Sequence, residues 1–467
     1  MNSHRSRIFT HDEQLEFARL SGDYNPIHLD PIIARRLIFG RDVLHGLHLV
    51  LWAMDQWLAG RTSPLRLRSV RVEFQRPASA GESIECASRE QPDGAARLEL
   101  FSAGIKLLVA DLQFGPGHSP TIDVPPPFPQ EHHPMERTPS DLRSCRGTIP
   151  LWLDPELAAH LFPNLARLLP VEQLATLLAT TRLVGMEAPG LHSIWRSFDL
   201  SESANLRLPQ LSYRANRFDE RFSLLELDIQ SPGLSGAVST AIRPPPSEQP
   251  AYATIRSMVR SDQFRGERAL VVGGSRGLGQ VATKLLAAGG ADVRFTYHRG
   301  AEDAKRVVSE ITRCDGSAED FQYDAIRDAS KLPLLLGQWK PTLLCYFATP
   351  FIFAGNRGRR SDELFQRFHD FYVTGFDATF RALNGVGRVL YPSSSAIDEL
   401  PQNMMEYAAA KAAGETLCRS LAEAYPGTRF HAPRFSRLAT DQTATLLRVP
   451  SADPVAPLLA ALRQLLE

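Results

Sequence analysis

The sequence predicts an α+β architecture, in which an antiparallel sheet wraps around a helix, followed by an α/β domain with a doubly wound parallel sheet. Three observations support this prediction: a helical apolar stripe followed by short strands, two clusters of prolines, and a strand, glycine-rich turn and helix after the second cluster. At about 100 to 200 residues per domain, a chain of 467 residues should hold two to four domains, and we expect three.

Composition excludes several classes of protein. Lysine plus arginine equals aspartate plus glutamate at 52 each, so no global field would attract nucleic acid or an anionic membrane. The five cysteines show no CxxC spacing, which argues against a metal site or disulfide framework and suits a reducing compartment. The most apolar run, Leu44 to Leu58, is too short to span a bilayer, and no leader opens the chain. We therefore expect a cytoplasmic protein with no membrane span.

Residues 1–115 contain the stretch around which the chain is organised. Asp23 and His28 stand five residues apart, separated by the turn-forming pair Asn25-Pro26, so the backbone must bend between them. The bend can aim both side chains at one point, and a carboxylate and an imidazole that converge there form a general acid/base pair. The alternative is an ordinary turn followed by Asp30 as a helix cap.

A central helix and a sheet should follow this turn. Apolar residues recur at spacings of three and four from Leu44 to Leu58, which places them on one helical face. Short runs rich in branched or aromatic residues come next, from V-R-V-E-F to G-I-K-L-L-V-A-D-L-Q-F, and proline and glycine turns separate them. These runs should wrap the helix as an antiparallel sheet.

The wider string S-G-D-Y-N-P-I-H-L-D closely resembles the S-G-D-x-N-P-x-H-x-D signature of the (R)-specific enoyl hydratases and MaoC-like dehydratases. The resemblance continues in Phe39, in L-H-G from Leu44, and in F-Q-R-P-A-S-A-G-E from Phe74. It implies a hot-dog fold with Asp23 and His28 as catalytic residues. It further implies that Asn25 and Gly46 bind substrate, with the Gly46 amide at a helix start holding the thioester oxyanion.

A second copy of the same fold is expected. Residues 116–140 are rich in proline and form a semi-rigid linker. Residues 141–245 repeat the order of helix, then strands, and aligning Phe198 with Phe74 puts Leu169-Pro170 where His45-Gly46 stands. No S-G-D-x-N-P-x-H string precedes it, so we interpret this segment as a degenerate second hot-dog that covers the first. The alternative is that residues 141–245 form an unrelated α+β segment. A second linker is expected at residues 246–264.

Residues 265–467 begin with a strand, a glycine-rich turn and a helix, where Gly273, Gly277 and Gly279 would let the backbone approach a pyrophosphate. This pattern is weak alone. Tyr407 and Lys411 lie one helical turn apart, so the ammonium can lower the pKa of the phenol, and Ser394 precedes Tyr407 by thirteen residues. A Tyr-x-x-x-Lys pattern by itself is usually a solvated helix face.

Together these positions resemble the short-chain dehydrogenase/reductases, most closely the 3-oxoacyl-carrier-protein reductase branch. The resemblance implies a Rossmann domain in which Ser394 polarises the substrate carbonyl, Tyr407 protonates it, and Lys411 supports both Tyr407 and the nicotinamide ribose. Two departures stand out: the family's relay asparagine falls on Tyr372, and its Pro-Gly on Pro433-Arg434. The predicted cofactor-binding residues are Gly273, Ser275, Arg276, Gly277, Leu278, Gly279, His298, Arg299, Asp324, Ala348, Tyr407 and Lys411.

Charge indicates the cofactor. No carboxylate ends the second strand of this domain, where an NAD enzyme usually holds the ribose 2′-hydroxyl; His298 and Arg299 stand there, and Arg276 lies in the glycine loop. These donors favour the 2′-phosphate of NADP(H), with a solvated basic turn as the alternative.

The two predicted sites share an intermediate. The reductase would convert a 3-oxoacyl thioester to the (R)-3-hydroxyacyl thioester, and the hydratase-like domain would exchange water between that alcohol and the 2-enoyl thioester. An acyl-CoA or acyl-carrier-protein thioester is the expected partner, and a homo-oligomer through the reductase domain is expected. Three alternatives are a hot-dog half that only binds acyl chains, a non-catalytic acyl-binding scaffold, and an oxidative role in degradation.

Overall fold

The computed structural model describes residues 3–117, 123–127, 133–203, 208–355, 358–446 and 449–467. The chain forms two compact units, one of Met1–Pro245 with Thr445–Arg448 and the other of Pro246–Ala444 with Val449–Glu467. Each unit has hydrophobic cores of its own. None of the helices in these described ranges is long and apolar enough to cross a membrane.

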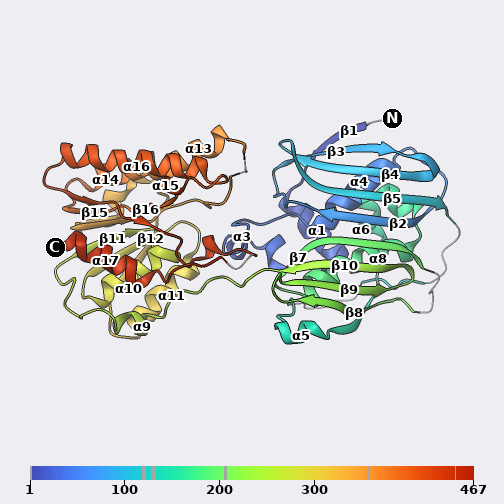
Figure 1. Ribbon diagram of the computed structural model, residues 1–467, viewed down its shortest axis with the longest axis horizontal. Coiled ribbons are helices and arrows are strands. Elements are labelled where there is room, and N and C mark those ends of the chain that lie inside the picture. Colours follow the sequence, from blue (N-terminus) through green and yellow to red (C-terminus); the bar gives the residue numbers. More distant parts are fainter. Residues whose placement is uncertain (1–2, 118–122, 128–132, 204–207, 356–357, 447–448) are drawn as a thin grey trace. The chain divides into compact units, whose positions relative to one another are not determined.

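The first unit is built on one antiparallel sheet with the strand order β1-β3-β4-β5-β2-β7-β10-β9-β8-β6, whose strands run side by side in Figure 1. The first copy supplies β1 (Ser3–Ile8), β2 (Leu65–Phe74), β3 (Ser83–Glu90), β4 (Ala95–Ser102) and β5 (Ile105–Pro116). The second supplies β6 (Arg146–Pro150), β7 (Ser193–Ser203), β8 (Gln210–Asp219), β9 (Leu224–Gln230) and β10 (Gly233–Ile242).

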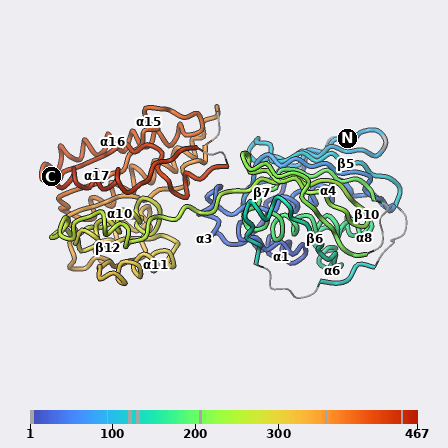
Figure 2. The backbone as a smooth tube through the Cα atoms, turned by 60° about the horizontal axis from the view of Figure 1, so that its bottom comes forward, coloured from blue at the N-terminus to red at the C-terminus, as the bar shows by residue number. Residues whose placement is uncertain are grey.

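Helices cover one face of this sheet, as Figure 2 shows for α1, α4, α6 and α8. The predicted central helix is α4, and its apolar stripe of Leu47, Leu51, Met54 and Leu58 is fully buried. The helices of this unit are α1 (His11–Ser21), α2 (Pro26–Leu29), α3 (Pro31–Ala34), α4 (Gly46–Leu58), α5 (Pro139–Arg143), α6 (Pro155–Leu161), α7 (Pro163–Leu168) and α8 (Val171–Arg182).

The two copies join at the strands β2 and β7, which pair antiparallel with Val72 opposite Phe198. Each copy thus closes one sheet edge of the other. The predicted helix from 168 to 183 is α8, which continues into a π-helical turn, η2 (Leu183–Glu187). Pro170 is its N-cap, as His45 is the N-cap of α4, so the helices correspond one residue later than the alignment predicted.

The second unit contains a six-stranded parallel sheet with the order β13-β12-β11-β14-β15-β17, and two apolar cores lie on its faces. Helices α10 and α17 lie on one side in Figure 1, and α14 and α16 on the other. The strands are β11 (Arg268–Val272), β12 (Asp292–Tyr297), β13 (Ala318–Gln322), β14 (Leu343–Tyr346), β15 (Arg388–Leu390) and β17 (Arg429–His431), with the short pair β16 (Ser393–Ser394) and β18 (Arg434–Phe435). The helices are α9 (Tyr252–Arg256), α10 (Gly277–Ala288), α11 (Ala301–Thr312), α12 (Leu332–Leu336), α13 (Asp362–His369), α14 (Gly375–Leu383), α15 (Ala396–Glu399), α16 (Met405–Ala424) and α17 (Val455–Leu466), with the π-helical turn η4 (Asp370–Thr374).

The predicted fold class is confirmed: two helix-and-sheet copies of the hot-dog type precede a doubly wound Rossmann sheet. The two predicted linker segments are not uniformly extended connectors in the structure. Within 116–140, residues 118–122 and 128–132 lie outside the described residues. Within 246–264, Tyr252, Ile255 and Phe264 are buried in the core of the second unit, because α9 packs on α10. The domain boundaries themselves stay predictions.

Candidate active sites

Local capping fixes the turn that carries Asp23 and His28. Helix α1 begins with a Thr10 capping box and ends at Gly22, whose φ of 79° is accessible to glycine without strain. Helix α2 begins immediately afterwards, with Asn25 as N-cap and Pro26 in the first turn. The stop and restart of the helix turn Asp23 and His28 toward each other.

Asp23 is held by both copies. Its Oδ2 accepts from the Thr181 hydroxyl at 2.7 Å, and its Oδ1 accepts from the backbone N–H of Asn25 at 3.2 Å. Burial raises the pKa of Asp23, and nearby His28 and these donors oppose the rise. A Cβ at Gly185 would stand 2.2 Å from Asp23 Oδ1, so only glycine fits beside the carboxylate. The degenerate copy therefore completes the environment of the predicted acid.

The tautomer of His28 follows from its hydrogen bond. Its Nδ1 lies 2.8 Å from the Val43 carbonyl oxygen, which can only accept, so Nδ1 carries the proton. Nε2 then has a free lone pair. Burial lowers the pKa of His28, while Asp23 opposes that change and Arg243 adds to it. A neutral imidazole with an open Nε2 is suited to accept a hydrogen bond or a proton from water.

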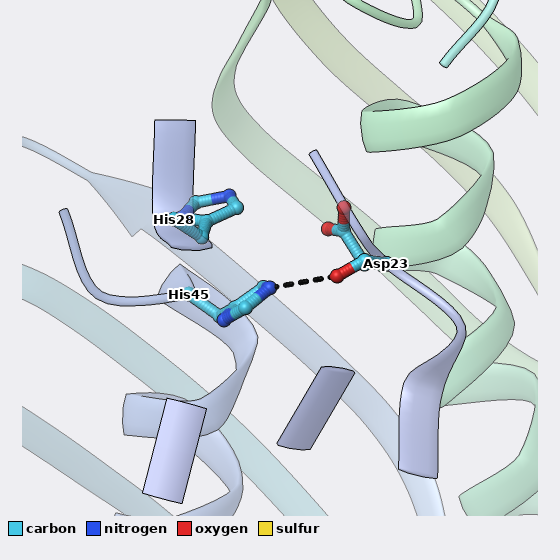
Figure 3. A group of neighbouring side chains, drawn as sticks. All are labelled: Asp23, His28 and His45. Atoms are coloured by element: carbon cyan, nitrogen blue, oxygen red, sulfur yellow. Dashed lines mark hydrogen bonds between the residues drawn. The ribbon is translucent and has the colours of Figure 1, made fainter. Parts of the chain in front are cut away.

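A third side chain, His45, stacks on His28 with ring centroids 3.9 Å apart, as Figure 3 shows. The ligand atoms of Asp23, His28 and His45 all lie within 4.8 Å of one another. His45 is fully buried, with its Nε2 3.0 Å from the Asp23 carbonyl oxygen and its Nδ1 2.9 Å from Gln14 Oε1. Burial lowers the pKa of His45, so its neutral ring donates to one of these oxygens and cannot donate to both. The pair suited to proton transfer is His28 with the Asp23 carboxylate.

The two predicted substrate-binding residues differ. Gly46 opens α4, and a Cβ there would meet the Phe74 ring at 2.7 Å, so the close approach requires glycine. Asn25 is fully buried, with its Oδ1 capping Ile27 and its Nδ2 donating to the Gly185 carbonyl at 2.8 Å. The Asn25 side chain thus fastens the turn to the second copy, and its contact with substrate stays a prediction.

Sequence reasoning missed the contribution of the second copy to this site. Thr181, Gly185 and Arg243 lie about 160 to 220 positions from the turn along the chain, on α8, on η2 and just after β10. No local pattern marks them. The sequence offered only one indication of such a role, the glycine and small polar residues near the end of α8, a helix with no recognisable motif.

The predicted cofactor loop of the second unit runs from the end of β11 into α10. Gly273 has a φ of 81°, and a Cβ at Gly279 would stand 2.1 Å from the Gly273 carbonyl oxygen, so neither position tolerates a side chain. Gly273 and Gly274 donate to Thr296 at the end of β12. The loop therefore presents its backbone at the N-terminus of α10, the position where a pyrophosphate binds in such folds.

The other predicted cofactor residues gather along the same sheet edge, because the carboxyl ends of parallel strands meet there. His298 Nε2 lies 3.5 Å from Asp324 Oδ2, and Arg299 is exposed beside it. The backbone of Ala348 is 3.1 Å from a Cβ built on Gly273. By position, Ser275, Arg276, Gly277 and Leu278 lie in the loop or first turn of α10, His298 and Arg299 follow β12, Asp324 follows β13, and Ala348 follows β14.

Ser394 and Tyr407, two of the predicted catalytic residues, lie in contact in the structure. Burial raises the pKa of Tyr407, and a hydrogen bond with the Ser394 side chain opposes the rise. Their catalytic roles stay predictions. Lys411 is itself buried, which lowers its pKa to about 7, and its Nζ donates to the Pro392 carbonyl at 2.7 Å.

The departure at Tyr372 has a defined structural result. Lys411 Nζ lies 3.9 Å from the centroid of the Tyr372 ring, and the Tyr372 carbonyl accepts from the Tyr391 hydroxyl at 3.0 Å. At the second departure, Arg434 pairs with Glu415 at 2.7 Å and with Asp398 at 2.6 Å. Aromatic rings thus surround the lysine where the family places a polar relay.

One family model matches the N-terminal part of the chain: residues 2–95 match the family of the MaoC like domain. This match and the fold together indicate a MaoC-like hot-dog domain, followed by a domain with a doubly wound Rossmann sheet.

Individual relatives cover the chain in pieces. An (R)-specific enoyl-CoA hydratase of Aeromonas caviae is 34% identical over 82 residues, which span 17% of this chain and 60% of that protein. A cyclic-di-GMP-binding biofilm dispersal mediator protein of Escherichia coli (strain K12) is 29% identical over 168 residues, 34% of this chain and 67% of that protein. The chain covers only 13% of the peroxisomal multifunctional enzyme type 2 of Drosophila melanogaster, which is 34% identical over 77 residues. A short chain dehydrogenase from Burkholderia cenocepacia J2315 in complex with NADP matches with a TM-score of 0.38 and 24% identity over 43% of this chain and 90% of that one.

Proposed function

We propose that the chain is a bifunctional enzyme of acyl thioesters. Its second unit reduces a 3-oxoacyl thioester to the (R)-3-hydroxyacyl thioester with NADPH, and its first unit interconverts that product and the 2-enoyl thioester by loss or addition of water. The observation that carries the proposal is the convergence of the Asp23 carboxylate with the proton-free Nε2 of His28. The hydratase named among the relatives supports the same chemistry for the first unit.

Asp23 and His28 would share the proton transfers. The open Nε2 of His28 can hold the water or the β-hydroxyl, and burial, which raises the pKa of Asp23, makes its carboxylate a stronger base than an ordinary aspartate. The Gly46 amide, which lies at the start of α4, would stabilise the thioester oxyanion. The oxygen lost from the β-carbon leaves as water, so no redox cofactor takes part in this step.

In the second unit, NADP(H) would lie across the Gly273–Gly279 loop, with Arg276, His298 and Arg299 beside its 2′-phosphate. The cofactor would supply hydride, and Tyr407, hydrogen-bonded to Ser394, would deliver the proton to the substrate oxygen. The NADP named for the solved short chain dehydrogenase belongs to that protein. A cytoplasmic location is in keeping with five free cysteines, and a homo-oligomer stays a prediction.

One observation favours a second candidate function, in which hydration is the main activity and reduction is slow. The Tyr372 ring lies over Lys411, the Tyr372 carbonyl accepts from Tyr391, and the Tyr372 hydroxyl hydrogen-bonds Thr349, so both oxygens of residue 372 are already engaged and less suited to a proton relay.

Selective inactivation tests the proposal. Asp23→Asn and His28→Ala should each reduce hydration of a 2-enoyl thioester by about two to four orders of magnitude and leave NADPH-dependent reduction unchanged. Tyr407→Phe should give the opposite result. The double variant of Asp23 and His28 should be little slower than either single one, because the two groups act as a unit. If Asp23→Asn hydrated the enoyl thioester at the wild-type rate, the acid/base assignment would be wrong and the first unit would be an acyl-binding module.

A further inference from the structure

The first unit contains a buried guanidinium that has no carboxylate partner among the described residues. Arg243 directly follows β10 and is 2% exposed, and its Nη2 donates to the Leu191 carbonyl at 2.6 Å. Among the described residues, its Nε and Nη1 have no hydrogen-bond partner. Burial lowers its pKa to about 10, and no described carboxylate contributes to holding its charge. Burying an unpaired cation is costly, so the position calls for an anion that completes it.

Arg243 lies beside the reacting pair. The Leu191 carbonyl that accepts from Arg243 also accepts from Asn25 Nδ2 at 3.3 Å, so the guanidinium adjoins the turn that carries Asp23 and His28. The charge of Arg243 is also felt by His28, whose pKa it helps to lower. Whatever anion binds Arg243 therefore lies next to the acyl carbons on which the pair acts.

We propose that Arg243 binds a carboxylate carried on the acyl chain, so that the first unit prefers enoyl thioesters with a second, ionised carboxyl group. The inference rests on the proposed hydration chemistry and adds its substrate class. A carboxylate can accept from the unused nitrogens and neutralise the charge, whereas a thioester carbonyl would leave it uncompensated. The phosphates of a carrier stand at the far end of the thioester arm, whereas Arg243 is almost completely enclosed and adjoins the turn that carries the acid/base pair. The second copy, which lacks an acid/base motif, thereby sets specificity for the first.

Binding of saturated thioesters tests this without any turnover. Matched acyl-CoA thioesters of four, five and six carbons, with and without a terminal carboxylate, would be titrated calorimetrically into the full chain. For at least one length the carboxylated member should bind about ten- to a hundredfold more tightly, the range expected for one charge-assisted contact. Arg243→Met should abolish this preference and leave binding of the uncharged member unchanged, and Arg243→Lys should keep part of it.

Arg182 provides a matched control. It is also buried, at 7% exposed, and its pKa is also lowered to about 10, but its guanidinium stacks on Trp152 at 4.6 Å and donates to the Pro150 carbonyl. Arg182→Met should leave the preference for the carboxylated thioester intact. Thermal melting of each variant checks that it folds, and the wild-type preference needs no variant at all.

The outcomes separate this inference from the proposed function. Equal or weaker binding of the carboxylated thioester at every length would overturn the inference, as would an Arg243→Met variant that weakens both members equally. A binding preference together with no hydration of either 2-enoyl thioester would leave the inference standing and sink the hydratase assignment. Rapid hydration of the uncharged enoyl thioester with no preference would do the reverse.

Discussion

Replacing Lys411 by methionine should stabilise the second unit while it abolishes reduction. Burial lowers the pKa of Lys411 from 10.5 to about 7, a gap of 10.5 − 7 = 3.5 units. At about 1.4 kcal/mol per unit, the buried ammonium costs roughly 5 kcal/mol. Methionine would leave the Pro392 carbonyl without its donor, which costs about 1 to 3 kcal/mol. The expected net gain in the free energy of unfolding at pH 7 is therefore about 2 to 4 kcal/mol.

The free energy of unfolding of the wild-type second unit should depend on pH because the pKa of Lys411 differs between the folded and unfolded chains. Between pH 7 and 10.5 the unfolded chain binds more protons at Lys411 than the folded chain, so wild-type stability rises with pH across this window. The advantage of Lys411→Met should shrink accordingly. Urea unfolding of both proteins at pH 7, 9 and 10.5, followed for the transition of the second unit, measures it.

Lys284→Met is the matched control, because Lys284 is also buried in the same unit but pairs with Glu310 at 2.7 Å. Its removal should destabilise the unit. A Lys411→Met variant that is less stable than wild type at pH 7, by an amount that does not change with pH, would refute the reasoning from burial.

Three further predictions follow from contacts in the two sites. Arg276→Ala with Arg299→Ala should weaken NADPH binding much more than NADH binding, at about 1.5 to 3 kcal/mol per lost contact; equal affinity losses in a fluorescence titration would contradict the assignment of the 2′-phosphate. Thr181→Val removes a donor to Asp23, so it should raise the pKa of Asp23 further, slow hydration about tenfold and shift the pH–rate profile to higher pH; an unchanged profile would separate the second copy from the chemistry. His48 is buried with its pKa lowered from 6.5 to about 3, so the unfolded chain binds the extra proton and wild-type stability falls as pH drops from 6.5 toward 3. His48→Phe should flatten this dependence in melting curves at pH 7, 5.5 and 4.5, whereas an identical slope in both proteins would mean that other groups cause it.

Local sequence was sufficient where a motif and its consequence lie within one turn of chain. The bend at Asn25-Pro26 predicted that Asp23 and His28 would converge, and the periodicity of Leu47, Leu51 and Met54 predicted α4. Both depend on dihedral preferences and spacing, which neighbouring residues determine.

What the sequence could not predict depends on pairing between distant segments. The contact of Thr181 with Asp23 exists because β2 pairs with β7, and the register of two strands separated by more than a hundred residues is a tertiary property. The structural role of Asn25 could not be predicted for the same reason, since the carbonyls that accept from its side-chain amide come from the second copy. No sequence pattern marks Arg243, and only its burial in the folded chain suggests that it binds an anion.

The junction of β2 with β7 determines how the first copy would behave alone. From Ser69 to Glu73 the backbone of β2 is paired on one side by β5 and on the other by β7. A chain cut after residue 117 would keep the pairing of β2 with β5 and lose β7. The edge of β2 that β7 had paired would then be a free row of amides and carbonyls. Such an edge is self-complementary in the antiparallel sense, so two truncated chains would tend to join through β2 itself, around a two-fold axis, or to aggregate. The duplication therefore supplies within one polypeptide the edge partner that a single copy would have to take from a neighbouring molecule.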